Sequence, residues 1–443
     1  MHKLIRVSAT AALTIAVSLA GMRSASAEIK IANIEGWEIS TSGRVNGFFS
    51  FIQGDAYPST TILGLPGTTN NLSAGAGLES QQFDANRKIQ TTRFRSGFVG
   101  AVLGFGVKTA LNPTTTIRAH IETWNTIETS RIKATANPTD VRQAYGKIEG
   151  PWGGLLFGRA LALFSRGAIT LNFLLQHGNG LGYPCNADSG GPTCGMVGYG
   201  VVFAGFNPQL TYNTPDMSGF QLSVGLFDPS NSPGKLEITP LPRIESEVTY
   251  EKSFGAGKVH LFVSGMYQTL KENWLNAHDR LKGAGATDDE ANATTDLKTV
   301  SSRAVNYGFW AELAMLRVGF SSHYGFGIGM NNALENTPVV FDSAHSPRKF
   351  DAYYGVIGLD IDPVYLNAGY GITRLFTTAQ DQDDAVTKLQ DPIKSQVGIS
   401  AGVNYRFSKN LIAALEYFNA DHTWYLGEKQ KVNVVNTGLT MVW

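Results

Sequence analysis

The sequence predicts an all-β protein, a transmembrane antiparallel up-and-down β-barrel of about sixteen strands. Three observations support this fold class: a two-residue alternation of apolar and polar side chains, a regular succession of short turns and long polar loops, and an N-terminal export signal. After that signal the chain has no apolar run of the roughly 18 residues that a spanning helix needs, so the sequence excludes helical membrane spans.

The alternation is clearest in two segments of the chain. In both, one set of alternate residues is mostly apolar or aromatic and the other set is mostly polar, which is typical of strands with one apolar and one polar face. The apolar sets are Ile39, Thr41, Val45, Phe49 and Phe51, and Ile244, Val248 and Tyr250; the polar sets are Ser40, Ser42, Arg44, Asn46 and Ser50, and Glu245, Glu247 and Glu251.

Turns and loops predict the number of strands. Short turns are expected at 111–114, 149–154, 215–219, 255–258, 313–315, 362–364 and 408–410; long loops are expected at 54–90, 128–139, 160–205, 229–242, 271–300, 328–347, 375–394 and 424–430. Sixteen strands follow, with both termini on the short-turn side. A soluble all-β protein would alternate in the same way, but the loop asymmetry, the even strand number and the export signal favour a barrel closed in lipid.

Residues 1–27 form the predicted secretory signal peptide. The segment starts with Lys3 and Arg6, continues through an apolar stretch at 11–20 and ends on the small residues 25–27, so cleavage is expected before Glu28. An N-terminal membrane anchor is the alternative, and it is disfavoured because the apolar stretch is shorter than the roughly 20 residues of a spanning helix. The barrel is then a single domain, residues 28–443.

The composition limits the partners of the mature chain. Charged residues make up 16% of the chain, against about 25% in a typical soluble domain. Removal of the signal takes away Lys3, Arg6 and Arg23. The mature chain then has 33 basic and 36 acidic residues, which gives a formal charge of −3. A nucleic-acid partner would need a basic surplus, so none is expected.

Only two cysteines occur, Cys185 and Cys194, in a loop-like segment. In an oxidising compartment a disulfide between them is the default prediction, and it would be worth about 2–3 kcal/mol. A metal-binding pair is the alternative, but no histidine clusters with the cysteines, since the nearest is His177.

Two stretches carry a family resemblance. "RQAYGKIEGPWGGLLFGRALALF" (142–164) reads as a strand, a tight turn and a strand ending in Gly-Arg, and "PQLTYNTPDMSGFQLSVGLF" (208–227) reads as the next hairpin. Together with the opening "GRVNGFFSF" and the aromatic C-terminus they resemble the general diffusion porins of Gram-negative outer membranes. The resemblance implies a trimer in the outer membrane in contact with the lipid bilayer and lipopolysaccharide. It also implies that the loop at about 160–205 is a constriction loop, which folds into the lumen and narrows the pore.

The chain ends on "KVNVVNTGLTMVW", whose alternation puts Val435, Leu439 and Met441 towards lipid and Asn436 and Thr440 towards the lumen. This last strand must pair with the first near 38–51 to close the cylinder. The resembled family usually ends on Phe. In its place Trp443 is the expected signal for the barrel-assembly machinery.

Strand parity puts a group of arginines on the lumen face, each beside residues suited to lipid such as Val45, Phe94, Ile117 and Tyr145. The expected pore-lining residues are Arg44, Arg93, Arg95, Arg118 and Arg142 on the wall, with Arg166 and Asp188 on the inner loop. In the resembled family, acidic residues of the third loop face such a cluster, whereas here Asp188 is the only acid of that loop. Charged rings set selectivity, so a net positive constriction with weak anion preference is the hypothesis. In the alternative, Glu122, Glu128, Glu245, Glu247 and lipopolysaccharide charges cancel it.

Passive diffusion of small hydrophilic solutes and ions is the predicted function. Two alternatives stay open: a substrate-specific channel for sugars, phosphate or other anions, and a non-conducting surface or adhesin barrel. Catalysis is not expected, because no G-x-S-x-G motif occurs and "GFGIGM" (325–330) lacks a βαβ context. The acidic stretches 286–296 and 379–386 could gather Ca²⁺ but lack EF-hand spacing, so they are interpreted as solvated external loops.

Overall fold

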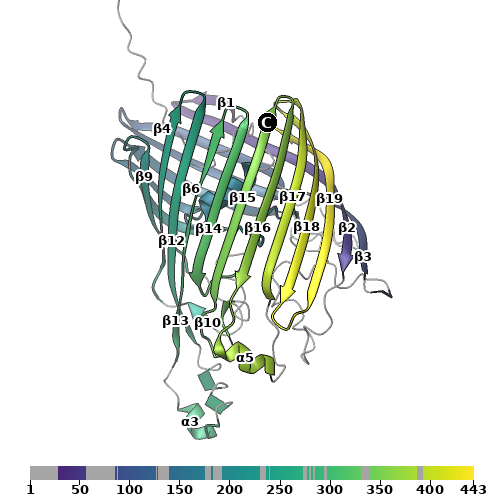
Figure 1. The fold of residues 1–443 in the computed structure, drawn as a ribbon. Helices are drawn as coiled ribbons and strands as arrows, with labels where there is room; N and C mark the ends of the chain where they lie inside the picture. Colours follow the sequence, from purple (N-terminus) through teal and green to yellow (C-terminus); the bar gives the residue numbers. More distant parts are fainter. Residues whose placement is uncertain are drawn as a thin grey trace, which may run out of the picture.

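A closed antiparallel β-barrel of sixteen wall strands forms the described part of the computed structural model (Figure 1). The structure describes residues 28–55, 85–86, 88–125, 127, 139–174, 181–182, 192–229, 236–238, 240–272, 277–278, 281–282, 285–293, 297–330, 340–342, 344–386 and 393–443. Residues 1–27 lie outside this part, so the signal peptide stays a prediction.

The wall strands follow one another around the barrel in chain order. They are β2 (Trp37–Asp55), β3 (Lys88–Arg95) with β4 (Ala101–Asn112), β5 (Thr115–Asn125), β6 (Thr139–Gly150), β7 (Gly153–Leu161), β8 (Phe206–Asn213), β9 (Phe220–Phe227), β11 (Arg243–Phe254), β12 (Gly257–Glu272), β13 (Thr299–Leu313), β14 (Leu316–Phe326), β15 (Lys349–Ile361), β16 (Val364–Leu375), β17 (Ile393–Ser408), β18 (Leu411–Trp424) and β19 (Lys429–Val442). All seven predicted short turns join neighbouring strands of this series. The predicted strand number and the seven short turns are therefore confirmed. The long loop predicted at 424–430 is wrong, because β18 ends at Trp424 and β19 begins at Lys429. A short connection joins these strands, with Gly427 at positive φ and a hydrogen bond of 2.9 Å from the Trp424 N–H to the Glu428 carbonyl.

β3 and β4 together occupy one wall position, because both pair with β2. Residues 96–100 interrupt the strand between them, which the alternation did not predict. The Asn46 side chain bridges the interruption: its Nδ2 donates to the Val99 carbonyl at 2.6 Å, and its Oδ1 accepts from the Gly97 N–H at 2.9 Å. The interruption therefore leaves these backbone groups satisfied inside the barrel.

The last strand closes the cylinder against the first, as predicted. β19 pairs with β2 from Val432 opposite Gly54 to Val442 opposite Arg44. The terminal Trp443 and Gly43 exchange two backbone hydrogen bonds of 2.9 and 3.0 Å. The chain end is thus held in the sheet and leaves no open edge.

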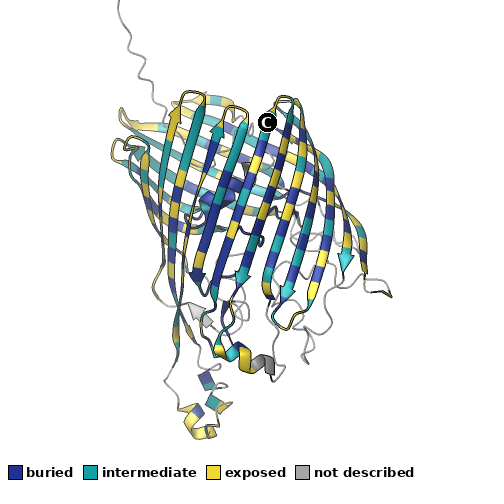
Figure 2. Cartoon of the chain, in the orientation of Figure 1, coloured by how far each residue is buried: buried dark blue, intermediate teal, exposed yellow. Residues whose placement is uncertain are grey.

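The apolar faces of the strands point outwards. Val45 and Phe49 are 47% and 49% exposed, whereas their chain neighbours Arg44 and Ser50 are 7% and 0% exposed. Figure 2 shows the same alternation of exposed and buried residues along most strands. This arrangement is the reverse of a soluble β-protein and fits a wall whose solvent is hydrocarbon.

Tyr145 is an exception to the predicted parity. We expected it on the lipid side, but it is 9% exposed and its ring lies 5.5 Å from that of His120 on the lumen side. A register shift between β5 and β6 places Gln143 opposite Glu122 but Val141 opposite Thr123. The extra residue, Arg142, reverses the alternation of β6.

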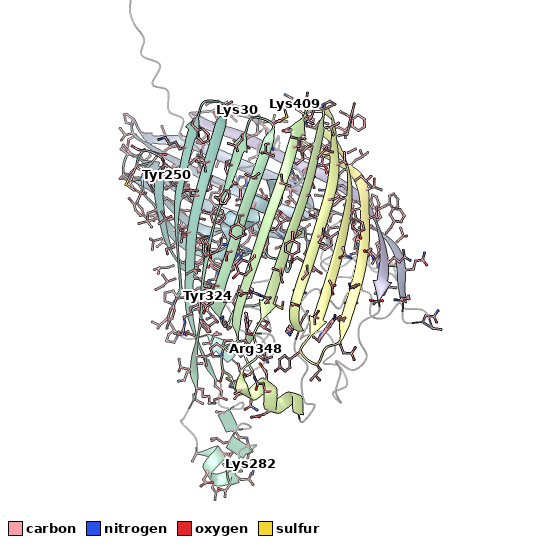
Figure 3. All side chains as sticks on the ribbon, in the orientation of Figure 1. Lys30, Tyr250, Lys282, Tyr324, Arg348 and Lys409 are labelled. Atoms are coloured by element: carbon pink, nitrogen blue, oxygen red, sulfur yellow. The ribbon has the colours of Figure 1, made fainter. Side chains whose placement is uncertain are left out.

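Several elements stand outside the wall series. β1 (Ile29–Ile34) folds back on β2, and β10 (Leu236–Ile238) pairs with β12. α1 (Arg166–Leu174) lies inside the barrel, and α3 (Asp288–Asn292) and α5 (Ala379–Val386) lie at the long-loop end. Figure 3 labels Lys30 and Lys409 at the short-turn end and Lys282 at the opposite end. Among the described residues no helix is long and apolar enough to cross a membrane.

Candidate functional site

The described parts of the segment between β7 and β8, the predicted inner loop, lie inside the lumen (Figure 1). Its described parts are 162–174, 181–182 and 192–205, and α1 packs against β12–β15. A Cβ at Gly319 on the wall would collide with Leu171 of α1, and one at Gly167 of α1 would collide with Phe262. These glycines let the helix approach the wall closely.

Acidic residues of β11 hold the start of the inner loop. Glu245 accepts the backbone N–H groups of Leu163 and Phe164 at 2.8 Å each, and its other oxygen lies 2.9 Å from Nε of Arg243. Arg166, at the start of α1, forms an ion pair with Glu247. Both acids face inwards, as the alternative to a net positive constriction assumed, and the charge of Arg166 is balanced locally.

Ser165 joins the outgoing and returning parts of the loop. Its hydroxyl oxygen lies 2.6 Å from the Val202 carbonyl oxygen and 2.8 Å from Nε2 of His323 on β14. Its backbone N–H donates to the Ser264 hydroxyl of β12 at 3.2 Å. One residue therefore ties both limbs of the loop to the wall.

The returning part of the loop is held by β16, β18 and β19. The Tyr199 hydroxyl lies 2.9 Å from Nε2 of His422, and the Gly200 N–H donates to the Thr373 hydroxyl at 2.8 Å. The Gly182 N–H donates to a Glu416 carboxylate oxygen, and its carbonyl accepts from Asn436 Nδ2 at 2.9 Å.

Sequence reasoning missed these anchors as a functional set. The signal was present, because Glu416 and His422 fall on the lumen side of β18, between exposed residues such as Leu415 and Tyr417. Parity alone could not show that the inner loop, and not water, would meet them.

The predicted wall arginines do not form a single ring. Arg44 and Arg142 both interact electrostatically with Glu122. Arg118 pairs instead with Glu149 at 2.9 Å, near the short turns. Arg95 is fully buried beside β2. The arginines therefore lie at several depths along the lumen, and only some share a neighbourhood.

Arg142 contacts two aromatic rings and a carboxylate. Its guanidinium lies 4.3 Å from the centre of the Trp124 ring and 5.7 Å from that of Phe206, and its Nε donates to Asp140 at 3.0 Å. Arg159 also reaches Asp140, at 3.6 Å. Three arginines, Arg44, Arg142 and Arg159, thus surround the carboxylates of Glu122 and Asp140.

Several predicted site residues remain untested. Asp188, Glu128 and Cys185 lie outside the described residues, so the disulfide to Cys194 stays a prediction. Cys194 itself packs, partly buried, against the core cluster of the inner loop.

The acidic stretches are engaged within the chain. In α3 the Thr287 and Glu290 side chains form a capping box, and Asp381 of α5 binds Arg348. Within the described ranges, no group of three or more His, Cys, Asp or Glu residues is placed to hold a metal ion.

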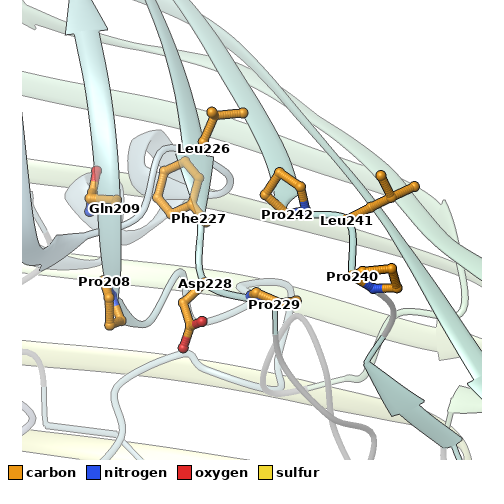
Figure 4. Close-up of a pocket in the computed structure, with 9 residues that line it drawn as sticks. All are labelled: Pro208, Gln209, Leu226, Phe227, Asp228, Pro229, Pro240, Leu241 and Pro242. Atoms are coloured by element: carbon orange, nitrogen blue, oxygen red, sulfur yellow. The ribbon is translucent and has the colours of Figure 1, made fainter.

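A hollow of about 430 Å³ lies at the long-loop end of β8, β9 and β11 (Figure 4). Its lining combines prolines and apolar side chains with Asp228. The residues are Pro208, Gln209, Leu226, Phe227, Asp228, Pro229, Pro240, Leu241 and Pro242. Gln209 Nε2 also donates to the Ala160 carbonyl at 2.8 Å, so this rim adjoins the point where the inner loop leaves the wall.

Comparisons with solved structures agree with this architecture. The outer membrane channel DcaP of Acinetobacter baumannii matches with a TM-score of 0.64 and 14% identity over 94% of this chain and 100% of that chain. An anion-selective porin from Comamonas acidovorans matches with a TM-score of 0.54 and 11% identity over 92% and 100%. OmpF of Salmonella typhi in complex with daunomycin matches with 0.52 and 11% over 94% and 100%. At these identities the likeness shows the fold alone.

A search of curated proteins finds no match. The model of the family described as Gram-negative porin matches residues 9–423, which is most of the chain. Together with the closed barrel and its inner loop, this match shows that the chain belongs to the Gram-negative porin family and is a channel of the outer membrane.

Proposed function

We propose that the channel carries small hydrophilic solutes and ions by passive diffusion, with a weak preference for anions. The observation that carries the preference is the group of Arg44, Arg142 and Arg159, which among the described residues lies around two carboxylates, Glu122 and Asp140. Arg166 does not contribute, since Glu247 balances it. The anion-selective neighbour shares only the fold, so it adds no weight.

Reversal potentials across a planar bilayer under a KCl gradient test the preference. Wild-type protein should favour chloride, and Arg142→Gln should reduce that preference. Lys252→Gln is the matched control, because Lys252 is exposed on the lipid-side face of β11 near the short turns. A clear cation preference of the wild type would overturn the proposal.

A substrate-specific channel is the second candidate, and a chain of aromatic rings supports it. The rings of Trp124 and Phe206 lie 5.5 Å apart, and those of Phe206 and Phe203 and of Phe203 and Phe98 each lie 6.1 Å apart. With Arg142 stacked on this chain, an anionic solute with an apolar ring face would fit. Small conductance steps blocked by one such solute would favour this candidate, large ohmic steps would favour general diffusion, and no steps would indicate a non-conducting barrel.

We also propose a homotrimer, recognition of Trp443 by the barrel-assembly machinery, and contact with lipopolysaccharide. Small residues such as Gly43 and Gly47 on the early strands could allow close approach of another subunit, but both glycines leave space for side chains of this chain. A Cβ at Gly43 would collide with the Trp443 ring and one at Gly47 with the Phe94 ring. Heat-modifiable migration in SDS gels tests the trimer, and deletion of Trp443 should impair membrane insertion far more than the conductance of inserted channels.

A further inference from the structure

The outward face of β12–β16 carries a row of cations near the long-loop end. Each cation shares strand parity with an exposed side chain of the lipid-facing surface: Lys271 with Tyr267, Arg303 with Val305, Lys349 with Tyr353 and Arg374 with Tyr370. One carboxylate of these strand ends, Asp351, shares this face, and Arg374 binds it through two hydrogen bonds of 2.7 and 2.8 Å. The face therefore keeps a positive excess.

Cations and aromatic rings alternate across the strands at one level. The register places Tyr267 opposite Arg303, Arg303 opposite Phe326, and Phe326 opposite Lys349. The Arg303 guanidinium lies 5.2 Å from the centre of the Phe326 ring, and Lys349 Nζ lies 4.7 Å from that of Phe376. Rings can accept such cations on their faces, and long cationic side chains near the end of a membrane-spanning strand place their charges at the membrane surface.

A groove of about 420 Å³ opens on the same face, directly beside Arg303. Its walls are apolar or aromatic side chains of β11–β14: Ile244, Tyr267, Val305, Tyr324 and Phe326. Gly265 lines it without a side chain, and a Cβ there would meet only the Ala304 carbonyl oxygen, at 3.5 Å. Figure 3 labels Tyr324 on this side of the barrel, in the half towards α5.

The surroundings determine the class of occupant. Long loops of outer-membrane barrels are extracellular, so the groove faces the outer leaflet. Its walls suit an acyl chain, and the cations at its outer end suit phosphate groups. The pocket of Figure 4 differs, since Asp228 is its one charged lining residue and it offers no cation.

We propose that this groove binds a phosphorylated glycolipid of the outer leaflet, with one acyl chain over Gly265 between Tyr267 and Tyr324 and a phosphate between Arg303 and Lys349. The inference deepens the proposed contact with lipopolysaccharide and is independent of the anion preference. Arg374 contributes less, because Asp351 already engages its guanidinium.

Native mass spectrometry of the detergent-solubilised protein, titrated with bisphosphorylated lipid A, tests the site. The double variant Arg303→Gln/Lys349→Gln should weaken binding at least about tenfold. Gly265→Leu should weaken it to a similar degree while keeping every charge, because the new side chain fills the groove. Lys252→Gln, which removes an outward cation at the opposite end of the wall, should bind as the wild type does.

Dephosphorylated lipid A separates the two halves of the site. Its binding should be insensitive to Arg303→Gln/Lys349→Gln but still reduced by Gly265→Leu. Unchanged heat-modifiable migration and conductance show that each variant is folded, since none of these side chains faces the lumen.

The outcomes separate this site from the broader contact. If the wild type does not bind lipid A, both the contact and the site are refuted. If the wild type binds and both variants bind equally well, the contact stands and this site is wrong.

Discussion

The two halves of the lumen wall use their inward polar residues differently. On β11–β19, Glu245, His323 and His422 are fully or almost fully buried, and each bonds to the inner loop. On β5 and β6, by contrast, the side chains of Arg118 and Glu149 pair with each other and remain 22% and 14% exposed. We call the inward face of β11–β19 the anchoring wall and the inward face of β5 and β6 the open wall. Both follow from the same strand parity, so the path of the inner loop decides which inward residues can contact solutes.

Glu245→Ala should have the largest effect on stability, because it removes a buried carboxylate of the anchoring wall. It removes the carboxylate partner of Arg243, which is 3% exposed, and the acceptor of two loop N–H groups. Breaking a buried ion pair costs about 3–5 kcal/mol. Urea unfolding in vesicles should show this loss, and single-channel records should show larger or noisier currents. Glu149→Ala on the open wall is the control, and equal losses in the two variants would contradict the comparison.

The anchoring principle extends to the external loops through Arg348 and Asp381, both fully buried. Figure 3 labels Arg348 at the long-loop end of the barrel. Burial alone would raise the pKa of Asp381, but hydrogen bonds from Arg348 and Thr378 hold it below its ordinary value of 3.8. A depressed pKa means that the pair stabilises the loop above about pH 4 and that this contribution is lost as the pH falls through the folded pKa.

Arg348→Met should therefore expose α5 to hydrogen exchange at neutral pH, with the barrel unchanged. The wild type should keep its protection down to about pH 4 and lose it only in stronger acid. Lys282→Met, which removes the exposed ion pair with Asp288, is the control and should change little. Loss of wild-type protection already near pH 6 would rule out Asp381 as the responsible group.

Tyr199→Phe should produce a smaller loss on the anchoring wall. It deletes one hydrogen bond to His422, worth about 0.5–1.5 kcal/mol, while the ring keeps its edge contact with Phe418 at 5.1 Å. Urea unfolding measures the change. A loss as large as that of Glu245→Ala would show that single neutral bonds, and not the buried carboxylate, dominate the anchoring.

Arg118→Gln should have the smallest effect on stability, about 0–1 kcal/mol, because its ion pair with Glu149 is partly exposed. It should nevertheless lower the permeability ratio of chloride to potassium slightly. A stability loss above 2 kcal/mol, on the order of a buried pair, would show that the open wall is also structural.

Much of the fold was predictable because lipid imposes a strict period. Alternation from Glu38 to Phe51 and the terminal stretch to Trp443 assigned lipid and lumen faces correctly. Prediction failed where the register shifts, as at Arg142, since one inserted residue reverses every later face of the strand and leaves no mark in the composition. Tyr145 was misassigned for this reason.

The candidate site was predictable in its ingredients but not in its grouping. The arginines and the inner loop were identified, yet Arg166 is paired with Glu247, across 81 positions in the chain. Likewise, Arg142 stacks on Trp124, a neighbour across the sheet and not along the chain.

The amino-acid sequence was enough to predict the class of barrel, its strand number and the closing pair of strands, because each depends on local period and turn chemistry. The inner loop was predicted from the family resemblance. The three-dimensional structure was needed to show which polar residues meet the loop, which cations pair with carboxylates, and that Arg303 lines an outward-facing groove with Lys349 on the other side of Phe326. Those pairings depend on register and on the path of the loop through the lumen, which bring together residues that are far apart in the chain.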